Sequence, residues 1–268
     1  MLLTVDIGNS NICIALMPDG DDTPLFFERL HTDPEKTVSE YERALRMILK
    51  MHSFRPSDIS GCVLSSVVPK AAKKLNGSLR RVFRCPVLCI SHELDLPFEN
   101  GMDIPSTVGQ DILCDAAGAS TFFRAPFVTF DMGTATVCSA VLPQQKGPEN
   151  GSSLPVLKSI YICPGVRTSL NSLWGRTSSL PDITLEGPKS VIGSNTADAM
   201  KSGIIFGTAG MADAMIDRIE EASGMKVSVT ATGGLSPYII PYMRHEVTYD
   251  PYLLMKGMKR IYEMNMPE

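Results

Sequence analysis

The sequence lacks the features that mark membrane proteins and nucleic-acid-binding proteins. No apolar run approaches the roughly 20 residues of a membrane-spanning helix, and no basic and apolar leader precedes Asp6. The net charge is −4, so the chain has no general cationic field for phosphate backbones or anionic lipid. We therefore expect a soluble protein without a cleavable signal, and neither nucleic acid nor membrane as a partner.

Cysteine and histidine are too few and too scattered for a disulfide framework or a zinc site. The seven cysteines include no Cys-x-x-Cys pair, and several, such as Cys62 and Cys89, lie inside apolar runs where a small thiol packs well. The four histidines form no local pair at zinc-ligand spacing. This pattern favours a reduced, cytoplasmic protein.

Three common signatures of nucleotide binding and hydrolysis are also absent. The sequence has no Gly-x-x-x-x-Gly-Lys-Ser/Thr loop, no Gly-x-Gly-x-x-Gly loop and no Gly-x-Ser-x-Gly elbow. P-loop and Rossmann phosphate binding are therefore unsupported, and so is serine hydrolase chemistry of the elbow type.

The first half of the chain has a mixed α/β order. At 44% hydrophobic, the 268 residues suffice for two domains. Periodicity predicts strand, strand, strand, helix, strand, helix and strand, over residues 2–7, 12–17, 25–30, 37–52, 62–68, 69–83 and 87–90. An initial meander followed by crossovers indicates a mixed sheet.

The second half repeats this theme. A strand over 127–132 ends in aspartate, and another runs on to residue 142. Asp6-Ile7-Gly8-Asn9-Ser10 and Asp131-Met132-Gly133-Thr134-Ala135 share the order Asp, apolar, Gly, polar, small, which indicates duplication. The remaining expected elements are a hairpin loop over 147–153, helices over 164–174 and 195–222, a strand over 227–232, and helices from 235 and 251.

Three glycines fall within the long helix expected over 195–222. Gly203, Gly207 and Gly210 lie on closely spaced turns, and each weakens a helix. They predict either close backbone packing or a break near 207–210.

The two Asp-Gly tips have the chemistry of a magnesium and phosphate site. A carboxylate at a strand end can hold Mg²⁺ or its water, while the amides and hydroxyls of a glycine turn meet phosphate oxygens. One such tip alone is explained as readily by a simple turn between two strands as by a phosphate site. Two tips facing each other across a cleft would clamp a phosphate chain, and Thr232-Gly233-Gly234 would let an adenosine lie against bare backbone.

Further stretches complete a pattern that is specific in its joint order and spacing. They are Ser65-Ser66-Val67-Val68-Pro69, Val108-Gly109-Gln110-Asp111, Pro164-Gly165, Arg176-Thr177, Leu180-Pro181, Val191-Ile192-Gly193-Ser194-Asn195-Thr196 and Ala231-Thr232-Gly233-Gly234-Leu235. In these stretches and both tips, the chain resembles the type III pantothenate kinases of the acetate and sugar kinase/Hsp70/actin superfamily. The resemblance implies an α/β fold of duplicated ribonuclease H-like (actin-like ATPase) domains, 1–117 and 118–268, with mixed central sheets and an interdomain cleft.

The resemblance also implies an activity. It is the ATP-dependent phosphorylation of the pantothenate hydroxyl to 4'-phosphopantothenate, the first step of coenzyme A biosynthesis, by a cytoplasmic homodimer. The cofactors implied are ATP, Mg²⁺ and a monovalent cation, K⁺ or NH₄⁺. The monovalent cation is expected near Asp131, and Asp6 is the second residue expected to bind metal.

Site residues carry over from the family by position. Asp111 is the expected catalytic base. The ATP site is expected to comprise Asp6, Ile7, Gly8, Asn9, Ser10, Asn11, Ile12, Cys13, Gly133, Thr134, Gly233 and Gly234. The acceptor site is expected to comprise Met102, Gly109, Gln110, Asp111, Ile112 and Thr196. From the residues alone, Asp111 is more simply a helix cap and Thr196 a first-turn helix residue.

The departures from the family pattern gather where the acceptor is expected. Ile112 stands in place of an arginine and Met102 in place of an aromatic residue, while Ser159-Ile160 and Cys138-Ser139 replace Gly-Gly and Phe-Asp. Loss of a guanidinium that binds a carboxylate costs a few kcal/mol. Three hypotheses follow, in this order: a pantothenate kinase, a kinase for another small hydroxylated acceptor, and a nucleotide-binding regulatory relative.

Overall fold

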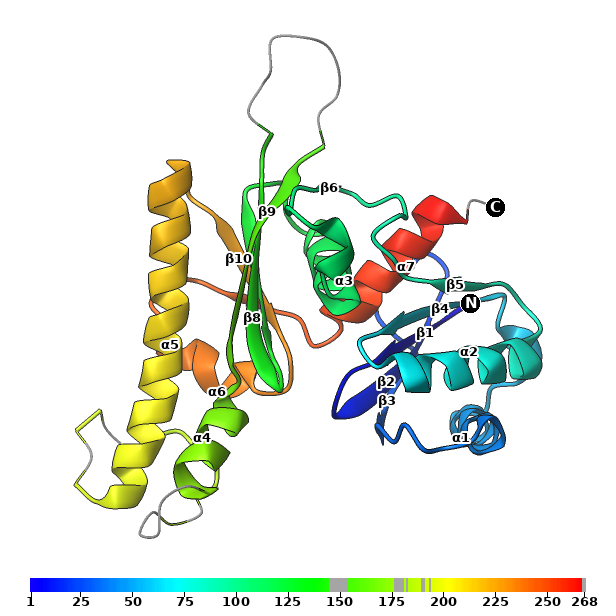
Figure 1. The fold of residues 1–268 in the computed structure, drawn as a ribbon, viewed down its shortest axis with the longest axis horizontal. Coiled ribbons are helices and arrows are strands. Elements are labelled where there is room, and N and C mark those ends of the chain that lie inside the picture. Colours follow the sequence, from blue (N-terminus) through cyan, green and yellow to red (C-terminus); the bar gives the residue numbers. More distant parts are fainter. Residues whose placement is uncertain (145–153, 176–180, 182, 189–190, 193, 267–268) are drawn as a thin grey trace. The chain divides into compact units, whose positions relative to one another are not determined.

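The computed structural model describes residues 1–144, 154–175, 181, 183–188, 191–192 and 194–266. The chain forms two compact units (Figure 1). Unit 1 comprises Met1–Thr121 and Tyr252–Glu268, and unit 2 comprises Phe122–Pro251. The division expected from the sequence differs from this one mainly in the last helix, which belongs to unit 1.

Unit 1 contains a mixed sheet with helices on it. Its strand order is β3-β2-β1-β4-β5, where β1, β2 and β3 are antiparallel and β4 and β5 continue in parallel. The strands of this sheet are β1 (Leu2–Ile7), β2 (Asn11–Met17), β3 (Phe26–His31), β4 (Gly61–Ser66) and β5 (Val87–Cys89). The short strand β6 (Glu99–Asn100) is not part of it. The helices are α1 (Val38–Met51), η1 (Pro56–Asp58), α2 (Pro69–Phe83), η2 (Pro105–Thr107), α3 (Gln110–Ala119) and α7 (Leu253–Asn265). The predicted order of elements in this half is confirmed.

Local sequence explains why α1 forms where it does. Thr37 and Glu40 make a reciprocal capping box at its start, which satisfies two amides that the helix leaves without partners. Its apolar residues recur at helical spacing and lie in the core of unit 1, and they include Tyr41, Leu45 and Ile48.

A close crossing of α3 and α7 holds the last helix in unit 1. The two helices lie side by side (Figure 1). A Cβ atom on Gly257 would overlap the Cys114 carbonyl, and one on Gly118 would overlap the Leu253 carbonyl. The helix backbones therefore touch at the two glycines, and α7 packs here although it is last in the chain.

Unit 2 repeats the arrangement of unit 1. Its strands lie in the order β11-β10-β7-β8-β9, with β7, β8 and β9 antiparallel and β10 and β11 parallel to β7. The strands are β7 (Phe127–Met132), β8 (Ala135–Leu142), β9 (Val156–Pro164), β10 (Ser228–Thr232) and β11 (Thr248–Tyr249). The helices are α4 (Val166–Gly175), α5 (Thr196–Ser223), α6 (Ser236–Ile239) and η3 (Ile240–Tyr242). The shared topology confirms the duplication.

The long helix α5 differs from its prediction. It runs unbroken through Gly203, Gly207 and Gly210, and a Cβ atom at each would meet nothing within 4 Å. The opposite face packs into the core of unit 2 through residues such as Ile205 and Ile216. The expected break is therefore wrong, and the glycine face is exposed in this chain. The strand β9 is absent from the sequence prediction, and the loop expected over 147–153 lies outside the described residues.

Candidate functional site

The first Asp-Gly tip is a tightly fixed turn between β1 and β2. Asp6, near the end of β1, is 8% exposed. The Gly8 amide donates to the Asn11 carbonyl oxygen at 2.9 Å. Thr32, which follows β3, holds the turn. Its amide donates to the Ser10 carbonyl oxygen at 3.0 Å, and its hydroxyl donates to the Gly8 carbonyl oxygen at 2.7 Å. The backbone beside Asp6 is thus set in one conformation.

The end of β4 links this tip to α3. The parallel pairing of β1 and β4 places Ser65 beside Asp6. The Ser66 amide donates to Gln110 Oε1 at 2.7 Å. Because Gln110 is the first residue of α3, the bond fixes the start of that helix at the strand end, and Asp111 with it.

Several carboxylates of unit 1 act on the thiol of Cys114. It lies one turn beyond Asp111 and is buried. Burial raises the pKa of the Cys114 thiol, and the negative charges of Asp6, Asp115 and Asp111 raise it further. The pairing of Asp6 with Ser65 and the Ser66–Gln110 bond likewise place Asp6 and Asp111, two of the residues expected at the site, in the same part of unit 1.

Asp111 is not the cap of α3. Gly109 occupies the N-cap position and makes no side-chain cap bond, so the interpretation of Asp111 as a cap is wrong. The Asp111 carboxylate folds back at the helix start, where Oδ1 accepts from the Ile112 amide at 2.9 Å. A Cβ atom on Gly109 would overlap that oxygen. Burial raises the pKa of Asp111 despite the two backbone amides that favour its charged form.

The second tip joins β7 to β8 and is shorter by one residue. The Gly133 amide donates to the Ala135 carbonyl oxygen at 2.9 Å, whereas in the first tip the glycine amide reaches one residue further. Asp131 is half-buried below the turn, and Thr134 is exposed at its apex. The two tips therefore have the same chemistry but different turns.

Asp131 lies against the glycine turn that follows β10. The parallel pairing of β7 and β10 places Thr232 beside Asp131. Gly233 has a φ of +89°, and a Cβ atom there would come within 2.5 Å of Asp131 Oδ1 and 2.7 Å of the Met132 carbonyl carbon. Glycine alone fits this position without strain. Unit 2 therefore brings Asp131, Gly133 and Gly233 together.

The start of α4 packs on the same turn. The Thr168 hydroxyl donates to the Thr134 carbonyl oxygen at 2.7 Å, and a Cβ atom on Gly165 would overlap that oxygen. Sequence reasoning assigned neither residue a role. The Pro164-Gly165 stretch is the feature of the sequence that could have indicated this contact.

The residues expected at the acceptor are spread over both units. In unit 1, Met102 is half-buried in the loop before η2, and Ile112 is 7% exposed. In unit 2, Thr196 is the exposed first residue of α5, which Asn195 caps through the Asp198 amide at 2.9 Å. Arg176, part of the family pattern, lies outside the described residues.

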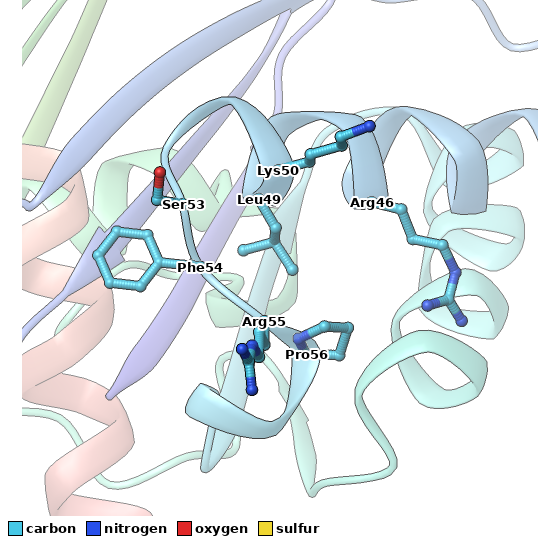
Figure 2. Close-up of a pocket in the computed structure, with 7 residues that line it drawn as sticks. All are labelled: Arg46, Leu49, Lys50, Ser53, Phe54, Arg55 and Pro56. Atoms are coloured by element: carbon cyan, nitrogen blue, oxygen red, sulfur yellow. The ribbon is translucent and has the colours of Figure 1, made fainter.

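A cavity in unit 1 lies away from all the expected site residues. It has a volume of about 390 Å³ and lies at the end of α1 (Figure 2). Arg46, Lys50 and Arg55 line it together with an apolar floor that includes Leu49 and Phe54. None of the residues expected to bind ATP or acceptor lines this cavity, and we assign it no part in the site.

The carboxylates suit a magnesium ion that arrives with a nucleotide. In the described part of the chain no group of three or more acidic, cysteine or histidine side chains is arranged to hold a metal. Magnesium bound to ATP needs only one or two carboxylates besides phosphate oxygens. Asp6 in unit 1 and Asp131 in unit 2 each lie near a strand end before a glycine turn, so either carboxylate could provide such a ligand. No helix of the described chain is long and apolar enough to cross a membrane.

Comparison with known proteins identifies the family. The family model for type III pantothenate kinase matches residues 2–218. The chain belongs to the type III pantothenate kinase family. A type III pantothenate kinase of Rubrobacter xylanophilus is 33% identical over 99% of this chain and 98% of its own length. One from Paramagnetospirillum magneticum is 34% identical over 99% and 98%.

Solved structures show the same fold at low sequence identity. A protein of Sinorhizobium meliloti, described as a 2-dehydro-3-deoxygalactonokinase, superposes with a TM-score of 0.61 at 12% identity over 100% of both chains. The predicted fold class, duplicated ribonuclease H-like α/β domains with mixed sheets, is confirmed. Membership of a kinase family implies ATP and a divalent metal as cofactors.

Proposed function

We propose that this protein transfers the γ-phosphoryl group of ATP to the hydroxyl of pantothenate, giving 4'-phosphopantothenate, the first step of coenzyme A biosynthesis. The supporting observation is family membership over the whole chain. The grouping of Asp6 with Asp111 in unit 1 agrees with a kinase activity. A protein that only bound the nucleotide would not need a proton acceptor beside a phosphate loop. We place the reaction in the cytoplasm, where ATP is available and the thiols stay reduced.

Asp111 is proposed as the base that orients and deprotonates the attacking hydroxyl. Phosphoryl transfer depends mostly on alignment and on neutralising charge, with a carboxylate accepting the proton. Burial raises the pKa of Asp111, which makes the carboxylate a stronger proton acceptor than an exposed one. The Ser66–Gln110 bond keeps it at the end of β4.

We propose that the loops at Asp6 and Asp131 each bind phosphates of ATP. The Gly8 and Gly133 amides are already bonded inside their turns, so the remaining amides and hydroxyls of the two turns would meet phosphate oxygens. Gly233 has no side chain to displace the Asp131 carboxylate, which packs against it. Bound Mg²⁺ would neutralise phosphate charge. A monovalent cation, K⁺ or NH₄⁺, is proposed near Asp131, where the half-buried carboxylate offers oxygen ligands.

Replacing Gly233 with alanine is expected to weaken ATP binding by more than tenfold. The new methyl group collides with Asp131 and Met132, and the positive φ adds strain of roughly 1 kcal/mol. Gly224→Ala is the matched control, because Gly224 has a φ of +70° but open space around its Cβ position. Calorimetric titration with an ATP analogue measures the difference. Equal affinity in the two variants would mean that ATP binding does not depend on the position of the Asp131 carboxylate.

A kinase for another small hydroxylated acceptor is the second candidate. Ile112 buries an alkyl side chain where the family resemblance expects an arginine, so a carboxylate partner is missing at that position. A regulatory relative without turnover ranks below both.

A coupled assay of ADP release tests the function. Purified protein with ATP, Mg²⁺ and K⁺ is supplied with pantothenate, with its alcohol analogue that lacks the carboxylate, and with related hydroxy acids. We expect pantothenate-dependent ADP and a rate that falls when Na⁺ replaces K⁺. ADP release with another acceptor alone favours the second candidate, and ATP binding without acceptor-dependent ADP favours the regulatory one.

We further propose a homodimer that forms through the glycine face of α5. Gly203, Gly207 and Gly210 are exposed along one stripe of the helix, and small residues let two backbones approach closely. Gly207→Arg is expected to shift the protein from dimer to monomer in light scattering after size exclusion, because the long charged side chain fills the contact. Glu221→Arg, on the same side but past the glycines, is the control and should remain dimeric. A dimer that survives Gly207→Arg contradicts this interface.

A further inference from the structure

Two cysteines of unit 1 lie against each other outside the proposed site. Cys62, on β4, is buried, and Cys85 lies half-buried between α2 and β5. Their sulfur atoms are 3.6 Å apart, and both thiols are free. The Cys62 amide donates to the Pro86 carbonyl oxygen at 2.9 Å, so the backbones that carry the two thiols are joined.

We propose that Cys85 and Cys62 form a site of reversible oxidation, at which a hydroperoxide oxidises Cys85 and Cys62 then closes a disulfide bond. A disulfide requires a sulfur separation of about 2 Å, so the two sulfur atoms must approach by about 1.5 Å. Cys85 lies in a short connection that follows the left-handed Arg84, outside any helix or strand. Rotation of its side chain can therefore supply the approach while β4 stays paired.

The surroundings divide the two roles between the thiols. A hydrogen bond from Cys62 lowers the pKa of Cys85 to about 7, although burial opposes this. The same contact, together with burial, raises the pKa of Cys62. The Tyr262 phenol of α7 packs against Gly61, the residue before Cys62. Burial raises the pKa of Tyr262, and charge on Cys85 and Cys62 raises it further. Cys85 is thus the half-exposed thiolate that reacts first, and Cys62 the buried thiol that resolves it.

The chemistry balances with a hydroperoxide as the only added reactant. The Cys85 thiolate attacks one peroxide oxygen, the O–O bond breaks, and hydroxide or an alkoxide leaves with the electron pair. Cys85 is then a sulfenic acid. The Cys62 sulfur attacks the Cys85 sulfur, the S–S bond forms and the S–O bond breaks, and the hydroxyl group leaves with the Cys62 proton as water. Two thiols are oxidised by two electrons in total, and the peroxide is reduced by two.

Cys89 gives an internal comparison. It lies on β5 and is more exposed than Cys85, but burial of its sulfur raises its pKa, and the Asn76 amide group donates to that sulfur at 3.3 Å. If exposure alone governed reactivity, Cys89 would react first. The proposed site requires the opposite order.

The test uses the full chain treated with hydrogen peroxide at neutral pH, followed by digestion and mass spectrometry. We expect a cross-linked peptide pair joining Cys62 and Cys85 that dithiothreitol reverses. In Cys62→Ser, dimedone should trap sulfenic acid at Cys85, and Cys89→Ser should still form the cross-link. A cross-link that persists in Cys85→Ser between other cysteines, or oxidation of Cys89 ahead of Cys85, overturns the proposal.

A second measurement needs no variant. Iodoacetamide labelling of the untreated protein at a series of pH values should modify Cys85 about tenfold or more faster than Cys89 at pH 7, with half-maximal rate near pH 7. Equal rates, or a Cys85 profile that rises only above pH 9, would overturn the proposed division of roles even if the serine variants fail to fold.

Discussion

Asp111→Asn should lower kcat by about 10²–10⁴-fold and leave ATP binding nearly unchanged. Asparagine keeps an oxygen that can accept from the Ile112 amide, so the start of α3 should keep its structure. What it loses is the ability to take the proton of the attacking hydroxyl. Steady-state ADP release and ATP titration measure the two quantities separately. A variant within tenfold of the wild-type kcat would remove Asp111 from the role of base.

The same substitution should not lower the melting temperature. Burial raises the folded-state pKa of Asp111 above its unfolded value. The contribution of this group to stability is therefore fully present only at pH values below the unfolded-state pKa. That contribution is lost as pH rises through the folded pKa. At neutral pH the buried charge therefore costs stability, and a neutral asparagine should melt at the same or a higher temperature. Asp103→Asn, at an exposed position, is the control and should change neither activity nor melting.

The raised pKa of Asp111 also sets the acid limb of the activity profile. The base works only when deprotonated, so kcat should fall as pH drops through the pKa of Asp111, which burial raises relative to an exposed aspartate. An acid limb at the pKa of an exposed aspartate would contradict the desolvated environment.

Gly257→Ala is expected to destabilise the protein by about 1–3 kcal/mol. The added methyl group overlaps the Cys114 carbonyl and comes within 2.8 Å of the Gly118 amide nitrogen, so α3 and α7 must move apart. At about 2–4 °C per kcal/mol for domains of 150–250 residues, calorimetry resolves the shift easily. Activity should fall as well, because α3 carries Asp111.

Gly77→Ala provides the matched control for this substitution. Gly77 lies within α2 and a Cβ atom there meets nothing within 4 Å, so alanine should stabilise the protein by about 0.5–1 kcal/mol through helix propensity. Both substitutions add one methyl group, but the expected changes in the free energy of unfolding have opposite signs. If both raise the melting temperature, the crossing at Gly257 is not tight.

The strands and the two tips could be predicted because their signals are local. Short, nearly continuous apolar runs specify β1, β2 and β7 with little help from the rest of the chain. The Asp-Gly order at Asp6 and Asp131 specifies two turns, and their recurrence indicates the duplicated topology that the two sheets have. The strand β9 was harder to recognise because its exposed and buried residues alternate poorly.

The sequence by itself determined the order of elements, the pair of aspartate tips and the family, since these follow from short patterns read along the chain. The tertiary structure alone decided that α7 packs in unit 1, that Ser66 holds Gln110, and that Cys62 touches Cys85. Each of these is a contact between residues far apart in the sequence. Such contacts depend on how closely two backbones approach, and no local pattern of residue types encodes that distance.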